Sequence, residues 1–194
     1  MIEITDRQLE IIESAGKILT SSGVSGLTIK KLALEMGFSE AALYRHFKSK
    51  EDILITMLKY LADDMEIRFE KIESTLPKEE RFEAIFKTQM EFFQKNKYFV
   101  VAVFSDGLLE ESVKINQQIY KIMQIKMKYL FPIIVENQKR GVFTNEISTE
   151  EVVHIVMGAF RLQMYKWRIS HFEFNIEQAG NHLIQSVLKL IKTK

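Results

Sequence analysis

The 194-residue sequence contains no cysteine, two prolines and eight glycines, and its charges nearly cancel. Without cysteine the chain cannot form a disulfide, a thiolate zinc site or an iron–sulfur cluster. The net charge of +1 excludes a polyelectrolyte-like disordered chain and a protein that coats nucleic acid by bulk charge. No uninterrupted apolar run approaches the roughly 18–20 residues of a membrane span, and the N-terminus lacks an export signal. We therefore expect a cytoplasmic protein with no membrane partner.

Apolar residues recur at the three- and four-residue spacing of helices, and the alternation typical of strands is almost absent. The pattern predicts an all-α protein of about nine helices. The first is expected around Leu9–Leu19, closed by Gly23 and Gly26, and the fourth runs from Ser49 to about Lys71. The later helices are expected over about 78–96, 98–109, 112–140 (kinked at Pro132), 149–170 (capped by Ser148 with Glu151) and 175–192.

Two short helices are predicted between the first and fourth. Thr28 is a plausible N-cap for the second helix, and Gly37 follows that helix directly, where the left-handed conformation turns the chain. Ser39 then caps a third helix, Glu40–Phe47. Two short helices joined by a glycine-containing turn form a helix-turn-helix, whose second helix enters the DNA major groove. A helical bundle also contains short helices and glycine turns, so spacing alone leaves both interpretations open.

Local charge favours the DNA-binding interpretation. Residues 28–50 contain five basic side chains against two acidic ones, a net charge of +3 in a nearly neutral chain. Thr28, Ser39, Tyr44 and His46 lie among them and can donate hydrogen bonds to phosphate oxygens.

The stretch GLTIKKLALEMGFSEAALYRHFKSKEDIL resembles the DNA-binding segment of the tetracycline-repressor (TetR) family, and the likeness extends over about residues 9–54. The resemblance implies a helix-turn-helix DNA-binding domain over residues 1–50 (the motif itself at about 28–47) and an effector-binding and dimerisation domain over 51–194. It further implies a homodimeric transcriptional repressor that binds a double-stranded, pseudo-palindromic operator and is released by a small molecule.

The resemblance also assigns roles by position. Thr28, Tyr44, His46 and Lys50 would contact phosphates, whereas the start of the third helix would face the groove. Glu40 could accept a hydrogen bond from cytosine N4, or simply be a favourable charge at a helix N-terminus. The complete expected DNA-binding set is Thr28, Lys30, Ser39, Glu40, Ala41, Ala42, Tyr44, Arg45, His46, Lys48 and Lys50.

The last two helices suggest a dimer surface. The helix after Ser148 is apolar around much of its circumference and must be covered on all sides, either by a two-fold mate or by the chain's own core. The expected interface residues are Val152, Ile155, Gly158, Ala159, Leu162, Leu183, Val187 and Ile191.

Aromatic and methionine side chains concentrate in the later helices: 11 of the 14 phenylalanines lie from Phe82 onward. Such side chains line ligand pockets, although they also fill ordinary cores. Taken with the resemblance, they predict a pocket for a hydrophobic or amphipathic effector, with Gln89, Asn116 or Gln163 as polar contacts. The expected lining residues are Phe86, Met90, Phe93, Phe104, Tyr120, Met123, Met127, Phe160, Met164 and Trp167.

An enzyme is not expected. The sequence shows no phosphate-binding glycine loop, nucleophile elbow or pair of catalytic carboxylates, and no cofactor is implied. Glu150 and His154 lie four residues apart, but a solvent-exposed ion pair explains them better than a metal. The alternative function is an all-helical protein-interaction module without an effector response.

Overall fold

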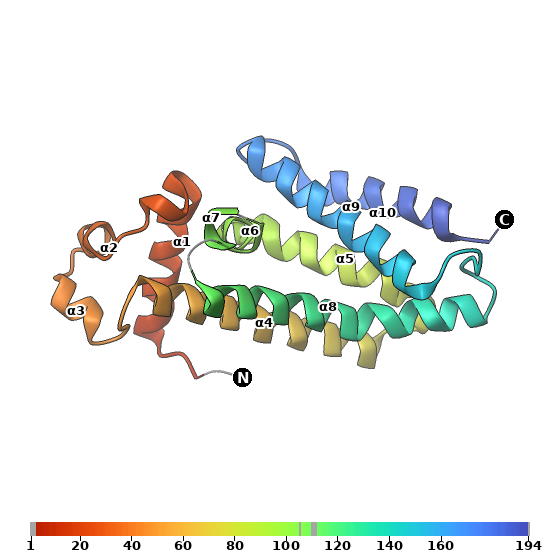
Figure 1. Cartoon of the computed structure of the whole chain (residues 1–194), viewed down its shortest axis with the longest axis horizontal. Helices are drawn as coiled ribbons and strands as arrows, with labels where there is room; N and C mark the ends of the chain where they lie inside the picture. Colours follow the sequence, from red (N-terminus) through yellow and green to blue (C-terminus); the bar gives the residue numbers. More distant parts are fainter. Residues whose placement is uncertain (1–2, 105, 110–111, 194) are drawn as a thin grey trace. The chain divides into compact units, whose positions relative to one another are not determined.

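A computed structural model describes residues 3–104, 106–109 and 112–193. Within these ranges the chain is helical, and a single isolated β-bridge pairs Phe143 with Lys192. The expectation of an all-α protein with about nine helices is confirmed. The helices (Figure 1) are α1 (Asp6–Gly26), α2 (Ile29–Met36), α3 (Glu40–Tyr44), α4 (Lys50–Thr75), α5 (Lys78–Lys95), α6 (Lys97–Phe104), α7 (Asp106–Leu109), α8 (Val113–Lys139), α9 (Thr149–Ile169) and α10 (Ile176–Ile191).

Several helix limits differ from those expected. Gly23 does not end α1 but interrupts it with non-helical backbone angles, and α8 continues through Pro132. The single helix expected over 98–109 is α6 followed by the short α7, and Ser105 between them lies outside the described residues. α3 has five residues rather than the eight expected, although the amide of Phe47 still donates to the carbonyl of Leu43 at 3.0 Å.

The cap expected at the start of α9 is present in full. The Ser148 hydroxyl accepts a hydrogen bond from the Glu151 amide at 3.2 Å, and a Glu151 carboxylate oxygen accepts from the Ser148 amide at 2.9 Å. The Ser148 hydroxyl also donates to that carboxylate oxygen at 2.7 Å, and this bond and the one from the Ser148 amide hold the pKa of the Glu151 carboxyl below its ordinary value. They fix where α9 begins, and therefore which of its faces turn inward.

The chain divides into two compact units. The first consists of Met1–Asp64 and Asn96–Ile122, in which α1 packs against α2 and α6. Gly16 permits this packing, because a Cβ at that position would lie 2.5 Å from the ring of Tyr98 on α6. The buried side chains of Ile12 and Leu19 contribute to the same core.

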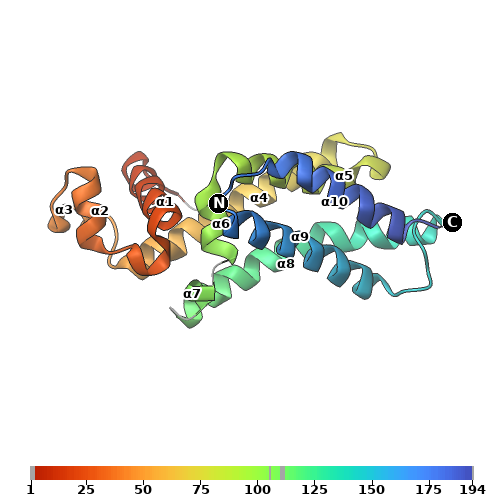
Figure 2. The ribbon, with the colours of Figure 1, turned by 90° about the horizontal axis from the view of Figure 1, so that it is seen from above.

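The second unit consists of Met65–Lys95 and Met123–Lys194. Its helix α10 packs against α9 and runs beside α5 (Figure 2). At the end of α9 the Trp167 indole donates to the carbonyl of Phe174 at 2.8 Å, so that this fully buried side chain has its polar atom satisfied.

The compact units describe packing, and the functional division expected at residue 50 stays a prediction. The first unit also takes in residues 51–64 and 96–122. The reason is that α4 and α8 are long enough to contribute to both units, and that α6 packs on α1. Among the described residues, no helix combines the length and the apolar character needed to cross a membrane.

Candidate nucleic-acid interface

The turn between α2 and α3 has the backbone of a helix-turn-helix. Gly37 caps α2 in the left-handed conformation, with φ 66° and ψ 29°. Directly after it, the Phe38 amide donates to the carbonyl of Ala33 at 2.8 Å and closes the end of the helix. A side chain at Gly37 would be strained at this φ. The chain therefore reverses over three residues, Gly37 to Ser39, before α3 begins.

Hydroxyl caps define the beginnings of both helices. Thr28 Oγ1 accepts from the Lys31 amide and Ser39 Oγ from the Ala42 amide, each at 3.1 Å. Each cap bond uses an acceptor lone pair of the hydroxyl and leaves its O–H free to donate. Since both side chains are exposed, each can hold its helix and still donate to a phosphate oxygen.

α3 has one buried and one exposed side. Leu43 and Phe47 are buried, whereas Tyr44 is 51% exposed. The first helix braces this arrangement, because Gln8 Nε2 donates to the carbonyl of His46 at 3.3 Å and the Arg7 guanidinium lies 5.3 Å from the ring centroid of Phe38. The outer side of α3 thus consists of polar and small side chains on a supported backbone.

The structure places the expected DNA-binding residues at the surface of this motif. Thr28, Lys30, Ser39, Glu40, Ala41, Tyr44, Arg45 and Lys48 are exposed, and Ala42, His46 and Lys50 are half-buried. Lys31, which contributes to the local positive charge, donates to the Ser22 hydroxyl at 2.7 Å. At the start of α4 the Ser49 hydroxyl accepts from the Asp52 amide at 3.1 Å, which fixes the backbone beside Lys48 and Lys50.

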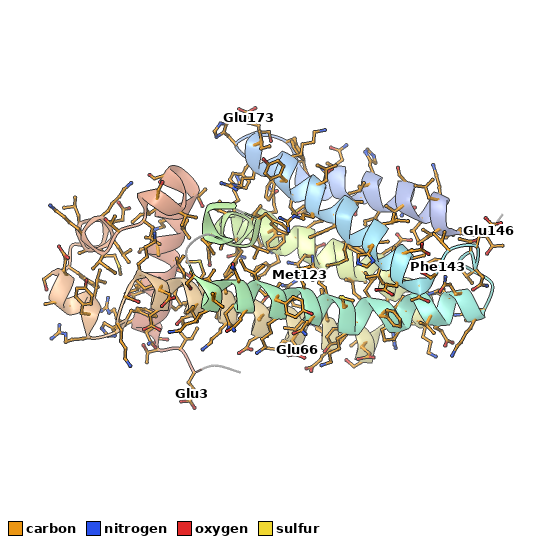
Figure 3. All side chains as sticks on the ribbon, in the orientation of Figure 1. Glu3, Glu66, Met123, Phe143, Glu146 and Glu173 are labelled. Atoms are coloured by element: carbon orange, nitrogen blue, oxygen red, sulfur yellow. The ribbon has the colours of Figure 1, made fainter. Side chains whose placement is uncertain are left out.

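The residues expected to line an effector pocket fall into two groups. Phe86, Met90, Phe93, Phe104, Phe160, Met164 and Trp167 are buried, whereas Tyr120, Met123 and Met127 are exposed. The last three lie three and four residues apart on one outer stripe of α8, where Met123 is labelled in Figure 3. They are therefore not interior lining residues in this structure. The buried stripe of the same helix runs through Ile119, Ile122 and Lys126 instead.

An aromatic cluster forms around Phe160 of α9. Its ring centroid lies 5.7 Å from that of Phe86 and 6.5 Å from that of Phe93, both on α5. Gln89 lies between these two phenylalanines on the same side of α5, is 1% exposed, and has a buried Oε1 without a hydrogen-bond partner. The pattern of apolar residues did not reveal that the Lys126 ammonium belongs to this cluster, with Nζ 3.4 Å from the Phe160 ring centroid.

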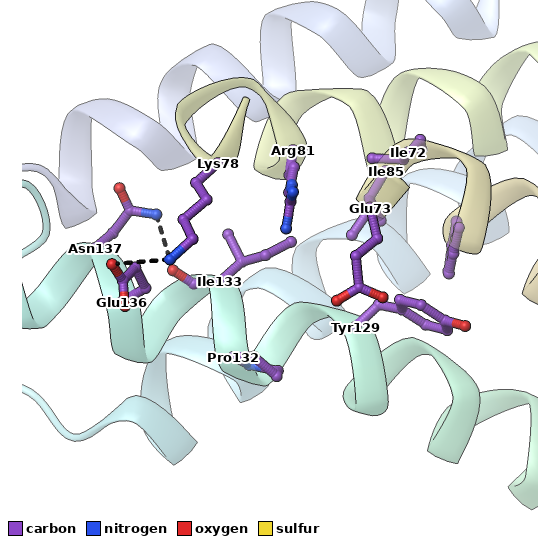
Figure 4. Close-up of a pocket in the computed structure, with 11 residues that line it drawn as sticks. Ile72, Glu73, Lys78, Arg81, Ile85, Tyr129, Pro132, Ile133, Glu136 and Asn137 are labelled. Atoms are coloured by element: carbon purple, nitrogen blue, oxygen red, sulfur yellow. Dashed lines mark hydrogen bonds and ion pairs between the residues drawn. The ribbon is translucent and has the colours of Figure 1, made fainter. Parts of the chain in front are cut away.

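A separate cavity of about 210 Å³ lies among α4, α5 and α8 of the second unit (Figure 4). Its lining includes Lys78, Arg81 and Glu136, and Lys78 Nζ donates to a Glu136 carboxylate oxygen at 3.3 Å. None of the expected effector residues lines it. Its volume is below the roughly 300–1,000 Å³ typical of small-molecule sites, so it does not fit the effector expected from the sequence.

The residues expected at a dimer interface also fall into a buried group and a more exposed group. Val152, Val187 and Ile191 are buried in the chain's own core, where a partner chain would not reach them. This burial corrects their expected place at an interface; they face inward because the α9–α10 pair packs on α5. The other members are exposed or half-buried: Ile155, Gly158, Ala159, Leu162 and Leu183.

The supported α2–α3 turn, its two hydroxyl caps and the all-helical remainder define a helix-turn-helix protein. Residues 11–57 match the family model described as "Bacterial regulatory proteins, tetR family". The TetR resemblance drawn from the sequence is thereby confirmed for this segment, which matches the DNA-binding part of the TetR family.

The chain is also similar to a named regulator and, in its fold, to solved structures. The chain is 28% identical over 162 residues to the uncharacterized HTH-type transcriptional regulator YerO of Bacillus subtilis, a match that covers 80% of this chain but only 56% of YerO. Its fold resembles that of the fatty acid degradation regulator FadR from Bacillus halodurans, with a TM-score of 0.83, 15% identity and coverage of 96% and 97% of the two chains. The FadR structure from Bacillus subtilis in complex with stearoyl-CoA has a TM-score of 0.80, 18% identity and coverage of 94% and 98%.

Proposed function

We propose that this protein binds a pseudo-palindromic DNA operator as a homodimer, represses transcription there, and releases the operator when a hydrophobic or amphipathic small molecule binds. The observation that carries the proposal is the helix-turn-helix itself. Gly37 turns the chain, Leu43 and Phe47 anchor α3, and the polar side of α3 remains uncovered. A short supported helix with an exposed polar side suits the major groove.

In this proposal Thr28, Tyr44 and Lys50 bind phosphates and position the motif, while Glu40 and the neighbouring alanines face the bases. Phosphate contacts supply affinity at every sequence, whereas contacts at base edges select the operator. The methyl groups of Ala41 and Ala42 can touch a thymine methyl.

A two-fold dimer would double these contacts and place two recognition helices about 34–36 Å apart. Its support here is an exposed apolar stripe on α9, where Ile155, Leu162 and Ile169 recur every seven residues and Gly158 and Tyr165 fill the intervening positions. Leu162 is 67% exposed, and the neighbouring apolar residues of the stripe are exposed as well. A contiguous apolar surface of this kind is typical of a protein–protein contact. Alternating spacings of three and four residues are those of a helix–helix seam.

The effector part of the proposal rests on the buried aromatic cluster of Phe86, Phe93 and Phe160. The similar Bacillus subtilis structure in complex with stearoyl-CoA supports a ligand with a long apolar chain. Such a ligand releases DNA only if it binds the non-DNA-binding arrangement more tightly than the other, because equal affinity shifts no population.

The test is a footprint of the purified protein on the DNA upstream of its own coding region, followed by affinity measurements at several salt concentrations. Tyr44→Phe and Lys50→Ala should each weaken binding at all sequences. Lys50→Ala should also lower the salt slope by about one, whereas Tyr44→Phe removes no charge and should leave the slope unchanged. Lys17→Ala removes an exposed lysine of α1 outside the motif and serves as the control. Unchanged affinity in both motif variants would contradict the assignment, and no footprint at all would favour the protein-interaction module.

A further inference from the structure

The interior of the second unit contains a lysine where its helix pattern calls for an apolar residue. Lys126 lies four residues after Ile122 and four before Leu130 on the buried side of α8, and it is 6% exposed. Its ammonium sits over the ring of Phe160, with Nζ 3.4 Å from the ring centroid. Burial, together with repulsion from the nearby Arg68 of α4, holds the pKa of Lys126 well below its ordinary value.

No negative charge in the described part of the chain compensates this lysine. Within these residues, no carboxylate or other acceptor forms a hydrogen bond or ion pair with Lys126 Nζ. The other charged group that acts on it, Arg68, is also positive; its guanidinium lies 4.3 Å from the ring centroid of Phe92 and donates to the carbonyl of Thr88 at 3.3 Å. An unpaired buried charge is costly, and such groups concentrate at functional sites.

The surroundings of Lys126 indicate what would satisfy it. The Phe160 ring beneath the ammonium packs against Phe86 and Phe93, which form an apolar wall. Gln89, between these two phenylalanines on α5, adds an amide whose Oε1 is buried without a partner. An apolar environment around a buried ammonium, with the Arg68 guanidinium near it, matches a molecule that is apolar along its length and anionic at one point. The Gln89 oxygen is an acceptor, so it suits a donor group of such a molecule rather than its anion.

We propose that Lys126 binds the carboxylate of an apolar, chain-like effector inside the second unit. This inference rests on the proposed effector response and specifies the chemistry of its ligand. A carboxylate suits this ammonium, because the Arg68 guanidinium already donates to the Thr88 carbonyl and lies on the Phe92 ring, and a polyphosphate would bury several negative charges here. The room for the chain would come from rearranged methionines, and Met90 and Met164 lie within one turn of Gln89 and Phe160 on their helices.

The test compares two ligands that differ only in the head group, dodecanoate and dodecan-1-ol, by calorimetry on the full-length protein. Wild type should bind dodecanoate at least about ten-fold more tightly, since a buried charge-assisted pair contributes more than one factor of ten. Lys126→Met should abolish that preference and leave the affinity for the alcohol unchanged. Lys121→Met is the matched control, because Lys121 is exposed on the same helix, and it should retain the full preference.

Equal affinity of wild type for the acid and the alcohol would overturn the inference while leaving an apolar effector site intact. A preference that survives in Lys126→Met would likewise overturn it, because the carboxylate would then bind elsewhere. If wild type binds neither ligand, the inference fails, and the operator footprint still decides the proposed DNA-binding function separately. The comparison of ligands on wild type needs no variant, so it holds even if Lys126→Met does not fold.

Discussion

Replacing Lys126 with methionine should stabilise the protein against unfolding. Methionine follows the path of the lysine stem and removes the amine, so the side chain keeps its packing against the buried side of α8 and loses its polar end. Burying a polar group without a hydrogen bond costs about 1–3 kcal/mol in mutational experiments. We therefore expect Lys126→Met to raise the free energy of unfolding by about that amount, or Tm by roughly 2–4 °C per kcal/mol in a chain of this size.

One interaction opposes this gain. The contact of the ammonium with the Phe160 ring is a cation–π interaction of about 2 kcal/mol when desolvated, and methionine forfeits it. The pKa of Lys126 is lowered by burial and by repulsion from Arg68, so both effects oppose the charged form on which the ring contact depends. We therefore expect the lost ring contact to offset only part of the gain.

The pH dependence provides an independent check. Because the folded-state pKa of Lys126 lies below its unfolded value, the unfolded chain binds more protons between the two, and the stability of wild type rises with pH there. The advantage of Lys126→Met should thus be larger at pH 7 than at pH 9.5. Urea unfolding at both pH values, with Lys121→Met as the control, measures it. A methionine variant that is less stable than wild type at pH 7 would refute the reasoning.

Three further substitutions test other parts of the structure. Gly16→Ala should destabilise the protein by about 1–3 kcal/mol in urea unfolding, because its Cβ would meet the Tyr98 ring, whereas Lys17→Ala at the exposed position beside it should be nearly neutral. Leu162→Arg should yield a monomer in light scattering, because it places a charge in the exposed apolar stripe of α9, whereas Arg161→Lys should not. A Leu162→Arg variant that stays dimeric would contradict the proposed dimer contact through that stripe. Ser148→Ala removes the hydroxyl half of the α9 capping box and should cost about 1 kcal/mol, whereas Thr149→Ser keeps both the box and the hydroxyl that donates to Gln138. Equal melting temperatures for wild type and Ser148→Ala would argue against the cap.

The helix-turn-helix could be predicted from the sequence because short-range chemistry determines it. Gly37 adopts the left-handed angle, and the Thr28 and Ser39 hydroxyls cap their helices as expected. The Ser148 box was predictable for the same reason. Each of these features depends on residues within four positions of one another, so no knowledge of the tertiary packing was required.

The effector and dimer residues were harder to predict, because apolar character does not reveal which side of a helix is covered. Tyr120 and Met123 are aromatic and methionine side chains like those around Phe160, but they lie on the exposed outer stripe of α8. Val152 and Leu162 lie on one apolar helix, yet the first is buried and the second is exposed. The spacing of Lys126 from Ile122 and Leu130 was visible in the sequence, but only the packing of α9 shows that the amine is enclosed.

The cost of Lys126 and its proposed role together predict that dodecanoate narrows the difference in stability between wild type and Lys126→Met. A ligand that binds only the folded protein adds RT ln(1 + [L]/Kd), about 2.7 kcal/mol at a hundred-fold excess over Kd. If dodecanoate binds wild type at least about ten-fold more tightly than Lys126→Met, the same concentration stabilises the variant by about 1.4 kcal/mol less. Lys126→Met should then melt above wild type without ligand and lose about 1.4 kcal/mol of that lead in dodecanoate, whereas dodecan-1-ol should leave the lead unchanged. A lead that stays constant with dodecanoate would mean that the amine destabilises the fold without contacting the ligand.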